Sequence, residues 1–374
     1  MKKKQILICA VMLLGIISIL IPNKLAAISN LNEEYQNNLY KAKVLSVTTK
    51  EEYNDTTVQI LKIKILDKDY KDYQTTIRNT LTNKGSDIVL KKSDVISVYL
   101  VEEGNEVNFY FHSYDKSFSL LLLCIIFITC IIVFGGIKGI KALISLILTI
   151  LLILFILVPL LLKGYNPILL SIITCLLATI ITFVVTNGFT KKSLIAILGV
   201  SAGLIIGGII AYVFSYLTRV SGVASDDAQM LQYLPGGIVF DFKGLLFAGI
   251  MIGALGACMD VAMEITSSLI EIKNHQPNVT EKELIKSGFN IGKDIMGTMV
   301  NTLILAYTGG SLSTILIFTG FNKSFTEIIN LDSITIEIIR AITGSMGLLC
   351  AIPCTVFIFI FINRKKRSLN EKNN

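Results

Sequence analysis

The feature that most constrains this chain is a series of apolar runs, each about as long as a bilayer is thick. Roughly 20 consecutive apolar residues are enough for a helix to cross the hydrocarbon core. Hydrophobic residues make up 53% of the 374 residues and charged residues only 16%, whereas soluble domains carry about 25% charged residues. These figures exclude an ordinary soluble enzyme and predict a membrane protein with several spans.

Hydropathy predicts an all-α membrane bundle of seven spans, within residues 117–363. The predicted spans are Phe118–Ile137, Ala142–Leu162, Pro167–Thr186, Leu194–Leu217, Leu245–Ser267, Ile295–Phe321 and Thr335–Ile362. A basic tail, residues 364–374, follows the last span.

The N-terminus has the layout of an export signal. Lysines follow Met1, an apolar run extends from Ile6 to Ile21, and a small-residue pair ends at Ala27. This pattern predicts that residues 1–27 are a signal peptide or remain as a signal anchor. In both cases the segment that follows is exported.

A polar block, residues 39–113, alternates apolar with polar or β-branched residues in short runs, which is typical of strands. The predicted strands include Ala42–Val47, Thr57–Leu66, Tyr73–Thr80, Val95–Val101 and Glu106–Phe111. We expect a small exported β-barrel-like, OB-like domain. Its single histidine, His112, stands at the end of the block without a catalytic set. A structural or partner-binding module is therefore expected, with an envelope protein as its partner.

Lysine and arginine are unevenly distributed between the predicted connections. The side predicted to be cytoplasmic carries Lys138, Lys141, Lys191, Lys192, Lys273, Lys282, Lys286, Lys293, Arg364, Lys365, Lys366 and Arg367. The other side carries only Lys163, Arg219, Lys243 and Lys323. Since positive residues favour the cytoplasmic side, we expect a multi-pass protein of the cell membrane with residues 28–116 extracytoplasmic and a cytoplasmic C-terminus.

Several functional classes lack support in the sequence. It contains no phosphate-binding loop, nucleophile elbow or zinc-protease motif, and no basic stripe with interleaved aromatic residues. The seven cysteines lie in apolar stretches without a CxxC pair. We therefore expect no enzyme activity, no cofactor, no metal site and no nucleic-acid partner; the bilayer is the expected surrounding, and the oligomeric state is left open.

Two carboxylates in the fifth predicted span are the most informative polar residues. Ionisable groups inside a membrane are costly unless they are paired or face water. Asp260 and Glu264 are one turn apart on one helix face, which Gly253 and Gly256 continue. Asp260 lies roughly 10 Å inside the predicted cytoplasmic end. It is the stronger candidate for a polar route, because Glu264 also fits a solvated interfacial position.

The sixth predicted span carries a mostly polar stripe at helical spacing. Its members are Asp294, Thr298, Asn301, Leu305 and Thr308. Polar side chains that face lipid are energetically costly, so we expect this stripe to face the bundle interior. The run Thr308–Ser311 contains two glycines midway along a stretch longer than one span. It predicts either a broken helix that lines a site or a helix thinned for close packing.

The seventh and fourth spans carry features that favour packing. Glu337 and Arg340, three residues apart, form a candidate structural ion pair. A face of small residues follows them, Gly344, Gly347, Ala351 and Cys354. The fourth span repeats glycine at every fourth position, at Gly199, Gly203 and Gly207, which indicates close helix contact.

The predicted outer loop between the fourth and fifth spans contains three acidic residues, Asp226, Asp227 and Asp241. Paired carboxylates could attract a hard cation to an outer mouth. A helix N-cap at Ser225 with acidic residues in the first turn explains Asp226 and Asp227 equally well. On the cytoplasmic connection, Thr280 and Glu283 form a predicted capping box.

Three segments carry recognisable motifs: Gly253–Ala262, Lys286–Tyr307 and the segment from Glu337 to Gly347. Together they resemble the YibE/F-like family of bacterial multispanning membrane proteins. The resemblance extends through nearly the whole chain, including an exported β-rich block before the first span. The resemblance implies an architecture and no substrate.

These observations favour a transporter of an ion or small solute, with carboxylates and amides on inward helix faces and proton coupling as a corollary. The alternative is a cell-envelope scaffold or sensor whose exported domain binds a partner. An intramembrane aspartyl protease is a weaker third reading, because Asp294 lies near the predicted cytoplasmic end while Asp260 lies deeper.

Overall fold

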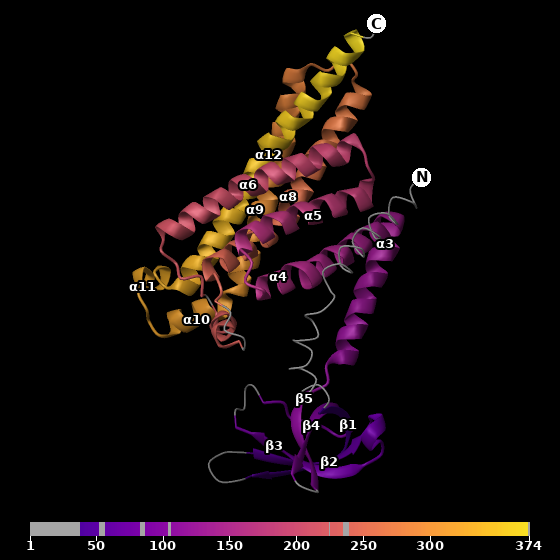
Figure 1. The fold of residues 1–374 in the computed structure, drawn as a ribbon, viewed down its shortest axis with the longest axis vertical. Helices are drawn as coiled ribbons and strands as arrows, with labels where there is room; N and C mark the ends of the chain where they lie inside the picture. Colours follow the sequence, from indigo (N-terminus) through magenta and orange to yellow (C-terminus); the bar gives the residue numbers. More distant parts are fainter. Residues whose placement is uncertain are drawn as a thin grey trace. The chain divides into compact units, whose positions relative to one another are not determined.

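The structure is a computed structural model that describes residues 38–51, 57–82, 87–103, 106–223, 225–234 and 239–372 (Figure 1). The predicted signal segment, residues 1–27, lies outside these ranges. The described chain forms two compact units that meet in sequence between Gly135 and Gly136. The first unit contains all the described strands and the beginning of a long helix, and the second contains the remaining helices.

The β-rich block forms one antiparallel five-stranded sheet of order β3-β2-β1-β4-β5. Its strands are β1 (Leu39–Glu51), β2 (Thr57–Ile65), β3 (Gln74–Leu81), β4 (Val95–Glu103) and β5 (Glu106–Tyr114). The edge strands β3 and β5 contact each other, so the sheet nearly closes into a barrel. The predicted strands are confirmed, although β1 is longer than expected because a bulge between Val44 and Ser46 lets it bend and continue.

One side of the sheet forms an apolar core, and a buried polar pair closes one end of it. Leu61, Ile63 and Ile96 are fully buried there. Gln59 accepts a hydrogen bond from the Leu90 backbone (3.0 Å) and donates one back (3.1 Å). Asn79 also donates to Gln59 (3.1 Å). These hydrogen bonds hold the loop before β4 against the sheet, and they satisfy the buried side-chain amides of Gln59 and Asn79.

The β unit continues directly into helix α3 (Ser117–Leu152). Asp115, between β5 and this helix, forms an ion pair with Lys41 of β1 (2.8 Å) and accepts a hydrogen bond from the Ser117 backbone (2.9 Å). The hydrogen bond from Lys41, followed by those from Ser117, lowers the pKa of the Asp115 carboxyl to about 2. The carboxylate is therefore ionised at neutral pH and links β1 to the first turn of α3.

Helix α3 is interrupted at Gly136, whose backbone (φ 52°, ψ −134°) lies in a region that glycine tolerates. The helical stretch then continues through a π-helical turn, η2 (Ile153–Leu157), into α4 (Val158–Leu162). The first two predicted spans thus form one helical stretch of 46 residues with a break at Gly136. At about 1.5 Å per residue its two parts together amount to roughly 70 Å of helix, about twice the thickness of a hydrocarbon core.

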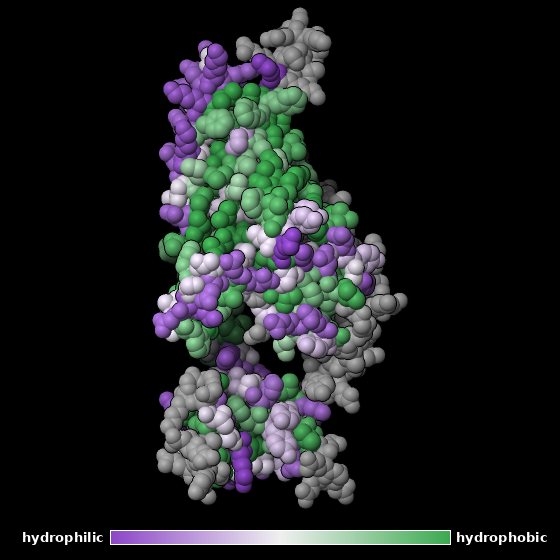
Figure 2. All heavy atoms as spheres, turned by 90° about the vertical axis from the view of Figure 1, so that its left-hand side faces the viewer, coloured by the Kyte–Doolittle hydropathy of each residue, from purple (hydrophilic) through white to green (hydrophobic). Residues whose placement is uncertain are grey.

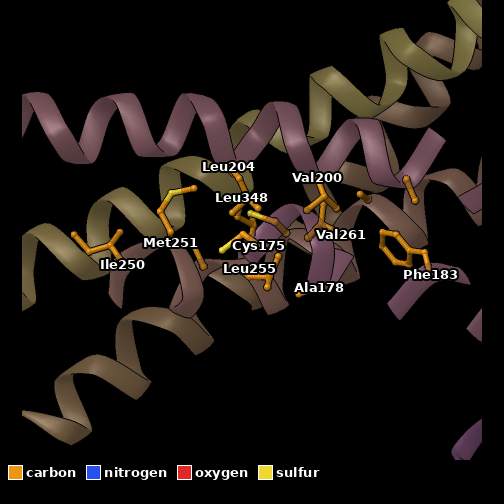
Figure 3. Packing of buried hydrophobic residues seen from close by; sticks show 14 of the residues in the cluster. Cys175, Ala178, Phe183, Val200, Leu204, Ile250, Met251, Leu255, Val261 and Leu348 are labelled. Atoms are coloured by element: carbon orange, nitrogen blue, oxygen red, sulfur yellow. The ribbon is translucent and has the colours of Figure 1, made fainter. Parts of the chain in front are cut away.

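The remaining helices are α5 (Pro167–Asn187), α6 (Lys191–Leu217), α7 (Asp226–Met230), α8 (Phe242–His275), α9 (Glu281–Gly310), α10 (Leu312–Gly320), α11 (Phe325–Ile329) and α12 (Asp332–Lys372). Helix α8 contacts α5, α6, α9 and α12 and is the centre of the bundle (Figure 1). Figure 3 shows side chains from α5, α6, α8 and α12 meeting in one core, with Cys175, Val200, Leu255 and Leu348 among them.

Five of the described helices are long and apolar enough to cross a membrane, or six if the bent pair α9 and α10 forms one span. This count takes the first two predicted spans together, because the two helices that meet at the Gly136 kink form one helical stretch. Figure 2 shows hydrophobic residues over much of one face of the helical unit, with hydrophilic residues gathered toward its two ends. Such a distribution is typical of a protein embedded in a membrane.

The glycines of α6 bring this helix against α12, as their spacing predicts. A Cβ atom added to Gly203 would lie 2.6 Å from the Cβ of Ala351, and one added to Gly207 would lie 2.7 Å from the Cα of Gly347. Distances this short leave no room for a side chain. Of the small residues of α12 identified in the sequence, Gly347 and Ala351 are therefore the partners of these α6 glycines.

Candidate functional site

The two carboxylates of α8 lie on its exposed face. The opposite face of α8 is buried in the core through residues such as Cys258, Val261 and Ile265. Asp260 and Glu264 are exposed on the surface of the helical unit. Within the described part of the chain no hydrogen bond or cation partner is found for Asp260, and its electrostatic neighbour is Glu264. Two carboxylates therefore lie together without a compensating positive charge.

The glycines of this face differ in what surrounds them. Open space lies where a Cβ atom would project from Gly249 or Gly256, whereas a Cβ on Gly253 would meet the hydroxyl of Tyr307 on α9. Helix α9 thus crosses α8 closely at Gly253. Nearer to the carboxylates, the same face of α8 stays uncovered.

The polar stripe of α9 is exposed, and its predicted inward orientation is wrong for the isolated chain. Asp294, Thr298, Asn301, Leu305 and Thr308 are all exposed. The face that packs against the bundle is the opposite one, because the side chain of Val356 on α12 lies directly over Gly288 and that of Ile352 lies directly over Gly292. Contact through these glycines fixes the rotation of α9 and turns the polar stripe away from the core.

The levels of the polar residues along the two helices can be compared through two contacts. A Cβ atom on Gly288 would lie 3.3 Å from Leu269, and Tyr307 meets Gly253. Counting along these antiparallel helices places Asp260 at about the level of Thr298, and Glu264 at about that of Asp294. The structure therefore places these carboxylates at common levels along α8 and α9, and no direct contact between Asp260 and Asp294 is found among the described residues.

Glu337 and Arg340 of α12 form the predicted ion pair, with 2.7 Å between Oε1 and Nη1. The Nε atom of Arg340 is buried and has no hydrogen-bond partner. Tyr307 lies within electrostatic reach of both residues. This tyrosine was missed as a site residue, since an isolated aromatic residue in an apolar helix gives no signal; its position opposite Gly253 becomes visible only in three dimensions.

The break predicted near Thr308–Ser311 is confirmed. Helix α9 ends at Gly310, α10 begins at Leu312, and the two axes differ by 56°. Open space lies where Cβ atoms would project from Gly309 and Gly310, so these glycines do not serve close packing inside the described chain. Of the two readings left open by the sequence, the broken helix is the one observed.

The acidic residues predicted at the outer mouth lie at helix N-termini. Ser225 caps α7 by accepting a hydrogen bond from the Ala228 backbone (3.2 Å), and Asp226 and Asp227 begin that helix. Asp241 caps α8 by accepting from Gly244 (3.0 Å). Asp241 also lines a cavity of about 250 Å³ beside Tyr165 and Asn166.

No cluster of three or more metal-binding side chains occurs among the described residues.

At the other end of α8, where α9 begins, the capping box of Thr280 and Glu283 is confirmed. His275 is the last residue of α8 and pairs with Glu271 (3.1 Å). The helix is longer than predicted because polar residues extend it beyond the apolar span.

Several long apolar helices around a common core, one of them accompanied by a break, define a multispanning membrane-embedded protein. The model of the YibE/F-like protein family matches residues 123–365. The chain therefore belongs to the YibE/F-like family, as its motifs indicated. No curated protein matches the chain. No solved structure matches it either.

Proposed function

We propose that the chain is a transporter of an ion or small solute, with Asp260 as the central residue of its polar route. The observation that supports this proposal is the exposed position of Asp260 on a membrane helix without a cation partner. An unpaired carboxylate facing lipid would be costly, so it requires water, a proton or a transported cation beside it. Proton coupling is a corollary.

The broken helix supports the same proposal. Helices α9 and α10 meet at Ser311 with a bend of 56°, and broken helices within membrane proteins commonly line an ion or substrate site. Thr308 stands one turn before this bend on the exposed face of α9. The proposed route follows α8 past Asp260 and Glu264 and borders the polar side of α9.

The proposal predicts a loss of flux when the carboxylates are neutralised. We expect Asp260→Asn to lower proton flux about tenfold or more in liposomes, and Asp294→Asn to lower it less, because Asp294 lies nearer the aqueous rim. Trapped pyranine would report the proton flux under imposed potassium or sodium gradients. Glu271→Gln is the matched control: this exposed carboxylate lies on the same helix, and its variant should match the wild type. Equal flux in all four proteins would contradict the proposal.

A scaffold or sensor role is the second candidate, and a specific patch on the β unit favours it. Leu39, Tyr99 and Tyr110 lie opposite one another across β1, β4 and β5 and are all about 40% exposed. The two tyrosine rings stack with their centroids 5.6 Å apart, and His112 packs edge-on against Tyr99. Exposed aromatic groups of this kind are enriched in protein interfaces.

This second role makes a different prediction. In cells treated with a cross-linker, the double variant Tyr99→Ser and Tyr110→Ser should lose the cross-linked partner of the β unit, while Asp260→Asn should retain it. The serines remove the aromatic contact area and leave the buried side of the sheet unchanged. A partner that survives the tyrosine changes would exclude this patch as the binding surface.

A further inference from the structure

We propose that two copies of the chain pack against each other through the exposed polar stripe of α9, here called the α9 seam. The seam consists of Asp294, Thr298, Asn301, Leu305 and Thr308. Its members follow one another in alternating steps of four and three residues. This is the spacing with which helices pack in left-handed pairs, both in coiled coils and in most membrane bundles.

The α9 seam has no partner within the described helical unit. The buried and partly buried residues of α9, such as Gly288, Gly292 and Met299, lie on its opposite side. Leu305, in the centre of the seam, is 68% exposed. A Cβ atom added to Gly297 would meet nothing within 4 Å, so a second helix could approach the edge of the seam closely.

Lipid is a poor cover for this seam because of Asn301. The threonine hydroxyls of the seam donate hydrogen bonds to backbone oxygens of their own helix, Thr298 to Ile295 (2.9 Å) and Thr308 to Ile304 (2.8 Å). No hydrogen bond of the Asn301 amide is found among the described residues. It lies about 10 Å beyond Asp294 along α9, where an unsatisfied amide costs several kcal/mol.

A second copy satisfies Asn301 better than the exposed first part of α3 does. An amide side chain both donates and accepts, so two Asn301 residues related by a two-fold axis can bond to each other reciprocally. The first part of α3 offers almost entirely apolar side chains, and its Thr129 hydroxyl already donates to Ile125 (2.7 Å). A single polar residue within an otherwise regular seam is a known determinant of register and oligomeric state.

The charged end of the seam fits the same arrangement. Lys293 and Asp294 are adjacent and exposed, and neither has an ion-pair partner among the described residues. In a parallel two-fold pair, Lys293 of each copy flanks Asp294 of the other, as flanking charges do in coiled coils. Pairing of the copies does not depend on transport, because it follows from the exposed polar seam alone.

Disulfide cross-linking in native membranes tests this proposal. The starting chain would retain Cys175 and Cys258, which are buried, with the other cysteines replaced by alanine. Single cysteines would then be introduced at Thr298, Asn301, Leu305 and Thr308. The controls are Ile205→Cys and Ile209→Cys, which are exposed on α6. Copper phenanthroline would oxidise each chain before electrophoresis without reductant.

We expect dimer yields at the seam positions about fivefold above those at the α6 positions. Uniformly low yields along the seam, yields that peak on α6, or a product of another mass that shows a different protein or segment at the seam would overturn the proposal. Single-molecule photobleaching of the otherwise unchanged chain provides a second measurement. Asn301→Leu should lower the two-step fraction severalfold, and Asn301→Gln should retain more of it, because glutamine keeps the amide. Equal fractions for both variants and the wild type would also overturn it.

Discussion

Replacing Gly203 by alanine is expected to destabilise the helical unit by about 1–3 kcal/mol, and replacing it by leucine by more. The added Cβ would lie 2.6 Å from the Cβ of Ala351 and 2.9 Å from both the Cα of Ala351 and the carbonyl oxygen of Gly347. Two of these three atoms belong to the backbone of α12, so a rotamer change cannot relieve the clash. Helices α6 and α12 would have to separate, which would open the core beneath them.

The measurement is reversible unfolding in detergent, followed by the helical circular dichroism signal. Gly249→Ala is the matched control, because a Cβ atom there would meet nothing within 4 Å. Alanine also favours a helix over glycine by up to about 1 kcal/mol, so this control should be neutral or stabilising. Equal losses in the two variants would show that the contact between α6 and α12 does not determine stability.

A second substitution at the same contact tests its geometry. Ala351→Gly removes one of the three clashing atoms but leaves the backbone contacts. Combined with Gly203→Ala, it should therefore restore part of the lost stability and not all of it. The interaction free energy from this double-mutant cycle should be about 1 kcal/mol.

The sequence was sufficient for features that depend on local pattern and spacing. Alternating residues predicted the strands, and the repeat of Gly199, Gly203 and Gly207 predicted a close helix contact because small residues at every fourth position share one face. The two glycines before Ser311 also indicated where the helix could break, although the sequence left open whether they break it or thin it for close packing. None of these inferences requires knowledge of which element lies opposite.

The orientation of α9 could not be predicted in the same way. A polar stripe indicates that one face differs from the other, and the assumption that polar faces point into a membrane bundle led to the wrong side. The rotation of α9 is set by Gly288 and Gly292, which receive Val356 and Ile352. These two glycines also stand four residues apart, so the spacing that predicted the contact of α6 was present in α9. It does not show which helix lies opposite, because the partners are more than 50 residues away in the sequence. If two copies pair, the polar stripe is buried after all, but between chains.

Neutralising Glu337 is expected to be among the most damaging single changes outside the glycine contacts. Glu337→Gln removes the anionic partner of Arg340, whose Nε atom is already buried without a hydrogen bond. Breaking one side of a buried pair costs 3–5 kcal/mol, because the remaining charge is left uncompensated. Both side chains are about a quarter exposed (25% and 27%), so we expect a loss near the lower end, about 3 kcal/mol, in the unfolding measurement.

Replacing both Glu337 and Arg340 shows whether the loss of stability comes from the charge left on Arg340 or from the lost attraction between the two side chains. The double variant Glu337→Leu and Arg340→Leu should unfold close to the wild type, because apolar replacements for a buried pair are often neutral or stabilising. Glu271→Gln supplies the control for a solvated pair: Glu271 and His275 are 70% and 77% exposed, and exposed pairs contribute at most about 1 kcal/mol. If Glu337→Gln and Glu271→Gln cost the same, Arg340 must find water or another partner, and its guanidinium would then be available to the polar route instead of serving only to hold α12.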